Sequence, residues 1–118
     1  MKENVLKVKS LSFAVRMVNL YKYLVAEHKE YVLSKQILRS GTSVGAMVHE
    51  AEFGQSMPDF ISKLSIAQKE INETMYWLVL LKETKYLSVE MFDSLNTDAI
   101  ELIKPIASSI KTAKKNNY

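Results

Sequence analysis

The chain has 118 residues, enough for one domain with an ordinary core, and its 47% apolar and 25% charged content is typical of a globular protein. It has no cysteine, which excludes disulfides and thiolate metal sites. The first residues lack the apolar core of a signal peptide, and no run reaches the roughly 20 apolar residues of a membrane span. We therefore expect a cytoplasmic protein without a membrane partner.

The net charge of +3 conceals an uneven distribution along the chain. Residues 1–49 carry a net +5, residues 50–101 a net −6 and residues 102–118 a net +4. Surfaces of opposite sign can attract an anionic partner or complement a neighbouring copy. A solvated surface with chance segregation explains the same pattern equally well.

Only 3 Gly and 2 Pro interrupt the chain, which favours an all-α fold. Ser10 or Ser12 can cap a first helix over about 11–27. Its apolar residues form one stripe of Leu11, Ala14, Val15, Val18, Tyr21 and Val25, with Phe13, Met17, Leu20 and Leu24 beside it. Because these residues cover more than half of the circumference, we expect this helix to be buried from more than one side, as at a subunit interface.

A second helix is expected over about 31–53, rich in small residues between Ser40 and Ala46. Its core stripe would be Leu33, Ile37, Ser40 or Gly41, Val44, Val48 and Ala51.

Helices one and two would form an antiparallel hairpin in which Phe13 meets Gly45 and Arg16 meets Thr42. Glycine would allow a close helix approach at Gly41 and Gly45. No strand precedes these glycines and no Lys follows at Walker spacing, so a phosphate-binding loop is disfavoured.

The third helix is expected over about 58–84. Ser56 and Asp59 resemble a capping box, and Pro58 sits in the first turn. The stripe has three- and four-residue spacing: Phe60, Leu64, Ala67, Ile71, Met75, Leu78 and Leu81.

Ser88 and Glu90 start a fourth helix over about 88–113, in which Pro105 predicts a kink or break near Lys104. The basic end, from Lys111 to Tyr118, is expected to fray. The four helices predict a single all-α domain, residues 1–118, folded as an up-down-up-down antiparallel four-helix bundle.

Catalytic and metal-binding patterns are missing. His49-Glu50 begins like a zinc-protease signature, but Phe53 occupies the place of the second histidine, and His28 is remote in sequence. No Glu-x-x-His pair of a di-iron bundle occurs. We therefore predict no enzyme activity, no catalytic or metal site and no cofactor.

Arg39 lies level with Glu73, one turn from Glu70, if helices two and three are antiparallel. We expect an interhelical ion pair between Arg39 and Glu73. The alternative is that these side chains point to water, where a pair contributes only ~0–1 kcal/mol.

Basic residues that could contact nucleic-acid phosphates are spread over three segments. They are Lys7, Lys9, Arg16, Lys22, Lys35, Arg39, Lys111, Lys114 and Lys115. Tyr21, Tyr23 and Tyr31 interleave with them and could stack on unpaired bases, or could form the edges of the core.

The segment from Arg39 to Leu81 also supports a resemblance to a known family. Its parts are RSGTSVGA at residues 39–46, Glu50, Gln55-Ser56, Asp59-Phe60, Ile66-Ala67, Glu73 and Trp77-Leu78, preceded by Ser12-Phe13 and Leu20-Tyr21. In this order and spacing they resemble the small four-helix-bundle proteins of intervening sequences in bacterial 23S ribosomal RNA genes. Met47, where the family often has Asn, and His49, where a small residue is usual, depart from the pattern.

The resemblance covers roughly residues 10–112 and implies a homopentameric ring of bundles. A related bundle, the accessory protein of diversity-generating retroelements, is a pentamer that works with a reverse transcriptase and binds nucleic acid through positive surface. We therefore expect a non-enzymatic homo-oligomer that binds RNA or DNA through repeated basic patches. The alternative is a protein-interaction scaffold whose partner is a protein, such as a reverse transcriptase.

Overall fold

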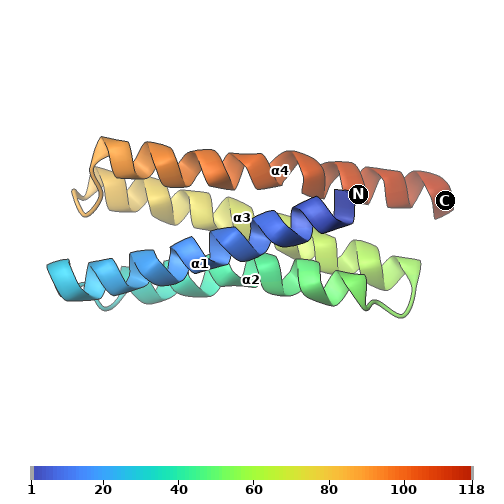
Figure 1. The fold of residues 1–118 in the computed structure, drawn as a ribbon, viewed down its shortest axis with the longest axis horizontal. Coiled ribbons are helices and arrows are strands. Elements are labelled where there is room, and N and C mark those ends of the chain that lie inside the picture. The colour runs from blue at the N-terminus through green and yellow to red at the C-terminus, as the bar shows by residue number, and fades with distance from the viewer. Residues whose placement is uncertain (1, 118) are drawn as a thin grey trace.

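The computed structural model describes residues 2–117, with side chains for residues 5–116, and this part of the chain folds into four α-helices without a strand. The helices are α1 (Lys2–His28), α2 (Leu33–Glu52), α3 (Met57–Glu83) and α4 (Val89–Asn117). They pack side by side in a rod of 48 × 22 × 20 Å, and the chain reverses direction at each short loop (Figure 1). The expected all-α four-helix bundle is confirmed.

Each helix packs against two others. In the described part of the chain α1 borders α2 and α4, and α3 borders the same two helices, so α1 and α3 lie diagonally across the bundle. The closest associations are α2 with α3 and α1 with α2, whereas α1 and α4 touch least. Within residues 2–117 no helix is both long and apolar enough to cross a membrane.

Two helix starts follow the signals in the sequence. Ser56 is the N-cap of α3, and its Oγ accepts a hydrogen bond of 3.2 Å from the N–H of Asp59. The Oγ of Ser88 accepts the N–H of Met91 at 3.1 Å in the same way before α4. Both bonds satisfy N–H groups that have no partner within the helix.

The start of α2 uses a carboxylate that the sequence pattern did not single out. Glu30 accepts the N–H groups of Val32 at 3.2 Å and Ser34 at 2.7 Å, and the Ser34 hydroxyl donates to the Glu30 carbonyl at 2.7 Å. Partial burial raises the pKa of Glu30, but the backbone N–H donors, with the Ser34 hydroxyl, outweigh it and hold the pKa below its ordinary value of 4.5.

Replacing Glu30 by alanine should therefore lower the free energy of unfolding by about 1 kcal/mol at pH 7, the usual effect of losing an N-terminal cap. A lowered folded-state pKa gives stability that is present above pH 4.5 and is lost as the pH falls through the folded value. Urea unfolding at pH 7 and pH 3 should show the difference between wild type and variant shrinking in acid. A difference that does not depend on pH would contradict this role for the ionised carboxylate.

The two apolar stripes of α1 lie in different surroundings. Phe13, Met17, Leu20 and Leu24 are all buried in the bundle. Leu11, Val15 and Val18 of the other stripe are exposed in the single chain, so burial of this helix from more than one side stays a prediction. Apolar residues surround this helix, so periodicity alone cannot tell which stripe faces the core.

α1 also begins nearer the N-terminus than the expected residue 11. Leu6 is buried in the common core, and this tertiary contact extends the helix back to Lys2. Ser10, expected as a possible cap, is buried inside the helix, where its hydroxyl donates to the carbonyl of Lys7 at 3.2 Å. Packing has overridden a local capping signal.

The two glycines of α2 allow the close approach of α1. A Cβ added at Gly41 would lie 2.3 Å from Cγ of Met17, and one at Gly45 would lie 3.1 Å from the carbonyl oxygen of Ser10. The expected meeting of Phe13 with Gly45 is corrected, because small Ser10 occupies that place and lets the two backbones come together. A structural role for the glycines fits both contacts.

α4 is one continuous helix through Pro105, so of the expected kink or break near Lys104 the break does not occur (Figure 1). Leu102 and Ile106 are buried on either side of the proline and hold both halves on the core. Glu101, whose carbonyl loses its N–H partner, is exposed, so water can replace the bond. The basic end is helical to Asn117 rather than frayed, and Tyr118 lies outside the described residues.

Candidate nucleic-acid interface

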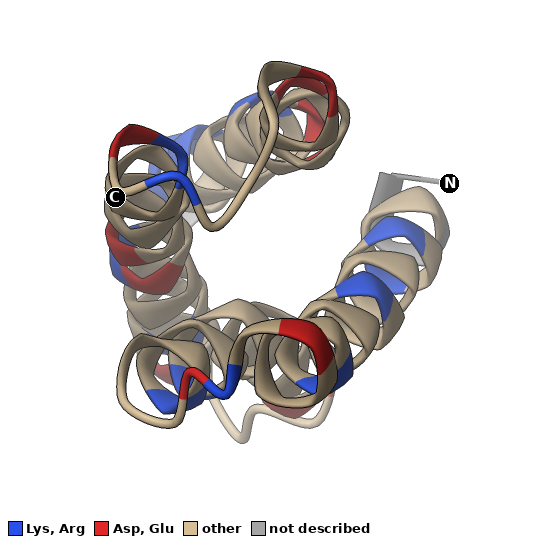
Figure 2. Cartoon of the chain, turned by 90° about the vertical axis from the view of Figure 1, so that its left-hand side faces the viewer, with Lys and Arg blue, Asp and Glu red and all other residues tan. Residues whose placement is uncertain are grey.

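The nine basic residues predicted to bind nucleic acid do not gather on one face. Lys7, Lys9, Arg16 and Lys22 lie on α1, Lys35 and Arg39 on α2, and Lys111, Lys114 and Lys115 on α4. Figure 2, which looks along the bundle, shows Lys and Arg on several helices rather than on one continuous face. They divide into residues that meet a carboxylate and residues that do not.

Three of the α1 residues, Lys7, Lys9 and Arg16, are held by carboxylates of other helices. Lys7 Nζ lies 2.8 Å from Glu52 of α2, and Lys9 Nζ lies 3.7 Å from Glu101 of α4. Because each positive charge already faces a negative one, Lys7 and Lys9 attract phosphate less than free lysines would.

Arg16 joins α1 to α4. Its Nη1 lies 2.6 Å from Asp98 Oδ2 and 3.3 Å from the Ser94 carbonyl, and Nη2 donates to Ser94 Oγ at 3.0 Å. The expectation that Arg16 meets Thr42 of α2 was wrong, since the Thr42 hydroxyl donates instead to the Leu38 carbonyl at 2.7 Å. Arg16 lies on the side of α1 that faces α4, where a carboxylate is within reach.

Arg39 forms the expected interhelical ion pair with Glu73, and it also contacts Glu70 at 3.2 Å. The indole N–H of Trp77 donates to Glu73 at 3.0 Å. This bond, together with the charge of Arg39, outweighs the effect of burial and holds the pKa of Glu73 below its ordinary value. Two carboxylates contact Arg39, so it forms a brace between α2 and α3, and a contact of Arg39 with phosphate stays a prediction.

A buried hydroxyl pair lies beneath this brace. Thr74 and Ser40 are fully buried, with their hydroxyl oxygens 2.9 Å apart, and the Thr74 hydroxyl is 2.8 Å from the Glu70 carbonyl. Arg39 and Ser40 of α2 therefore join α2 to Glu70, Glu73 and Thr74 of α3.

Five of the nine predicted residues form no ion pair within the described part of the chain: Lys22, Lys35, Lys111, Lys114 and Lys115. Lys22 and Lys35 lie on neighbouring helices near the α1–α2 loop, and both are exposed. Tyr31 in that loop is also exposed, whereas Tyr21 and Tyr23 are partly buried. Only Tyr31 of the three tyrosines presents half of its surface for stacking.

The other three lysines lie in the last turns of α4. Lys111 and Lys115 share one helix face with Lys104, which the prediction omitted, because the three are seven and four residues apart. Lys104 is exposed and has no ion pair within residues 5–116. The spacing from Lys104 to Lys115 was visible in the sequence, but Pro105 predicted a kink or break near Lys104. Lysines near a helix C-terminus also stabilise the helix, because their positive charge interacts favourably with the helix dipole. This effect explains the three lysines without any ligand.

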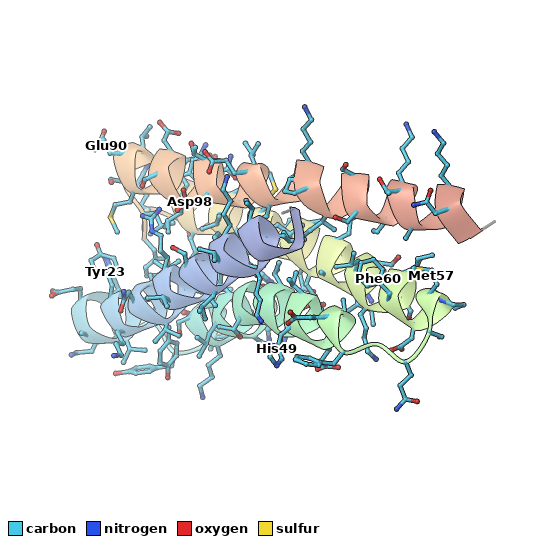
Figure 3. All side chains as sticks on the ribbon, turned by 45° about the vertical axis from the view of Figure 1, so that its right-hand side comes forward. Tyr23, His49, Met57, Phe60, Glu90 and Asp98 are labelled. Carbon is cyan, nitrogen blue, oxygen red and sulfur yellow. The ribbon has the colours of Figure 1, made fainter. Side chains whose placement is uncertain are left out.

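The two histidines lie apart. His28 contacts the rings of Tyr23 and Tyr86 edge-on, each at 5.3 Å between centroids, and His49 contacts Phe53 at 5.1 Å. Figure 3 shows His49 near the α2–α3 turn and Tyr23 at the other end of the bundle. Among the described residues no group of three His, Cys, Asp or Glu side chains is placed to hold a metal ion.

Comparison with known proteins identifies the same family that the sequence resembles. A family model described as 23S rRNA-intervening sequence protein matches residues 2–108. A crystal structure of a protein with unknown function from the S23 ribosomal protein family of Bacteroides thetaiotaomicron is 61% identical, with a TM-score of 0.93. The match covers 94% of this chain and 99% of that one. No curated protein matches this chain. Since the family model spans most of the four helices, the chain belongs to the 23S rRNA-intervening sequence protein family.

Proposed function

We propose that this chain is a non-enzymatic protein that assembles as a homopentameric ring of up-down-up-down bundles and binds RNA through repeated lysine patches. The observation that carries the RNA proposal is the basic face of α4. Lys104, Lys111 and Lys115 follow one another along this face, and neither they nor nearby Lys114 form an ion pair in the described part of the chain. Free lysines on one surface attract phosphates without regard to base sequence.

A ring would repeat this face once per copy. Several weak contacts to one RNA then act together, because after the first contact the others occur at high effective concentration. Lys22 and Lys35, with exposed Tyr31 between them in sequence, would form a second repeated contact near the α1–α2 loop. The family relationship to ribosomal RNA intervening sequences makes structured RNA the first ligand to test.

Replacing Lys111, Lys114 and Lys115 by alanine should weaken RNA binding and flatten its salt dependence. Each phosphate contact contributes roughly 0.7–0.9 to the slope of log K against log salt. The affinity should be measured by fluorescence anisotropy with labelled RNA of a 23S intervening sequence, from low to physiological salt. The same loss is expected for unrelated structured RNA, because the contacts read phosphates.

A matched control removes the same charge from lysines that already face carboxylates. Replacing Lys7, Lys9 and Lys82 by alanine should change RNA affinity much less, since these lysines lie near Glu52, Glu101 and Glu83. Equal losses in the two triple variants would mean that only net charge matters. An unchanged affinity in the Lys111, Lys114 and Lys115 variant would reject the RNA proposal.

The second candidate is a protein-interaction scaffold or an accessory protein of a reverse transcriptase that has no direct nucleic-acid role. The exposed apolar stripe of α1 favours it, because such a surface suits a protein partner. The fold does not decide between the two functions. RNA affinity that is the same in wild type and lysine variants, together with a ring that dissociates when the stripe is altered, would support this alternative.

A further inference from the structure

The outer face of α1 is apolar. Val8, Leu11, Val15 and Val18 follow one another at spacings of three and four residues, and each exposes between 37% and 67% of its surface. They lie on the side opposite the core residues of the same helix. A surface helix normally places polar residues there. We call these four residues the α1 stripe.

A second apolar surface lies between α3 and α4, away from the α1 stripe. Val79 of α3 and Val89 and Ile100 of α4 are exposed, with Met75 and Ile103 partly buried beneath them. We call these five residues the α3–α4 surface. It faces away from the contact of α4 with α1, because Val89 and Ile100 share the side of α4 that faces α3.

The register of α3 and α4 makes this surface continuous. Lys82 Nζ lies 4.3 Å from the centre of the Phe92 ring, which fixes the relative height of the two antiparallel helices. Val79 is then level with Leu95, between one and two turns along α4 from Ile100.

We infer that the α1 stripe packs on the α3–α4 surface of a second copy of this chain. This inference rests on the oligomer proposed above and names the two faces that meet in it.

The heights of the two surfaces match when copies stand side by side in the same direction. Within one chain Arg16 contacts Asp98 and Lys9 contacts Glu101, so position 11 of α1 lies at about the height of Ile100 on α4. In a neighbouring copy displaced sideways, Leu11 and Val15 would therefore meet the segment from Asn96 to Ile100. Copies related by rotation about an axis parallel to the bundle have this arrangement.

Charge points to the same partner surface. The charged residues of α1 between positions 5 and 22 are all basic, so two α1 helices packed back to back would bring like charges together. On α4, Asp93 is exposed and forms no ion pair within residues 5–116. It lies four residues from Val89 and seven from Ile100, on the same helix face. Lys22, also unpaired, would stand at about the height of Asp93 in the side-by-side arrangement.

When two copies meet through two different faces, the pair still has one free α1 stripe and one free α3–α4 surface. Such heterologous contacts continue until they close into a ring or extend as a filament, whereas a face that pairs with itself stops at a dimer. The two cases can be separated by disabling one face at a time.

The test uses two double variants: Leu11→Glu with Val15→Glu, and Val79→Glu with Ile100→Glu. All four side chains are exposed, and far-UV circular dichroism checks that each variant is folded. Each variant alone should be monomeric by light scattering after size exclusion. An equal mixture should give a heterodimer of two 13.5 kDa chains, because only one functional junction can form. If the glutamate variant at Leu11 and Val15 does not fold, the milder double variant Leu11→Ser with Val15→Ser replaces it and is expected to behave in the same way.

Two outcomes would overturn the inference. One is a Val79 and Ile100 variant that alone keeps the wild-type mass, which would show that the α1 stripe pairs elsewhere. The other is a mixture that stays monomeric. Glutamate at Val32 and Phe53, exposed apolar residues outside both faces, is the matched control and should leave the mass unchanged. These mass measurements contain no RNA, so they test the interface independently of RNA binding. If the mixture forms a heterodimer but the lysine variants keep their RNA affinity, the interface stands and only the RNA proposal is rejected.

Discussion

Replacing Gly41 by leucine is expected to lower the free energy of unfolding by about 3 kcal/mol, the upper range for overpacking a core. A Cβ at this position would lie 2.3 Å from Cγ and 2.6 Å from Sδ of Met17, which has no exposed surface into which it can move. The better helix propensity of leucine offsets at most ~1 kcal/mol of this loss in the free energy of unfolding. Urea unfolding at fixed protein concentration measures the difference.

A control and a second variant show whether the clash is the cause. Lys35→Leu adds a similar side chain on the exposed face of the same helix and should change stability by less than about 0.5 kcal/mol. Met17→Ala should make room for a side chain at position 41. The double variant Gly41→Ala with Met17→Ala should therefore lose less stability than the sum of the losses in the two single variants. Additive effects would contradict the packing of Met17 on Gly41.

Replacing Arg39 by methionine should cost about 2 kcal/mol near pH 7. Breaking a fully buried pair costs roughly 3–5 kcal/mol, and the effect is smaller here because the Arg39 side chain is half exposed. Glu70, whose side chain is only 12% exposed, loses its ion-pair partner and remains close to Glu73. The two carboxylates would then repel each other.

The effect of this change depends on pH in a defined direction. The indole N–H of Trp77 and the charge of Arg39 keep the pKa of Glu73 below its ordinary value of 4.5 in the folded state. The stability gained is therefore complete above pH 4.5 and is lost as the pH falls through the folded pKa. Urea unfolding of wild type and variant at pH 7 and pH 3 should show the difference shrinking in acid.

Lys63→Met is the control for a weaker contact. Lys63 lies 3.9 Å from Glu50 and 3.7 Å from Asp59 on the surface, so its loss should change stability by less than about 0.5 kcal/mol. A difference for Arg39→Met that is as small as that of Lys63→Met, or that persists unchanged in acid, would contradict the brace between α2 and α3.

Local signals were sufficient for much of the fold. The hydroxyls of Ser56 and Ser88 mark helix starts, and α2 and α3 begin and end within two residues of the expected bounds. The antiparallel pairing of α2 and α3 across their short turn is enough to predict that Arg39 lies near Glu73. These features depend on residues close in sequence or on one short turn.

Features that depend on distant packing could not be predicted. The rotation of α1 could not be predicted because both Leu11 and Phe13 belong to apolar stripes, and only the surrounding helices decide that Phe13 is buried. Pro105 lacks an N–H, yet the buried residues around it keep α4 intact. Arg16 could reach either neighbouring helix, and its choice of Asp98 depends on the position of α4.

The candidate site illustrates the same limit. Sequence shows which residues are basic, but not which of them already face a carboxylate. Lys7 and Arg16 are paired with residues more than 40 positions away, so no local pattern reveals that they are neutralised. The unpaired lysines at the end of α4 became a continuous set with Lys104 only because the helix passes through Pro105.

The most direct test of the proposed oligomer is the mass of the wild-type protein in solution, measured by light scattering after size exclusion at low and high salt. The account predicts a single species of five chains, five times the 13.5 kDa of one chain, at both salt concentrations, because the contact between α1 and the α3–α4 surface is mainly apolar. A monomer of 13.5 kDa at both salt concentrations would contradict it.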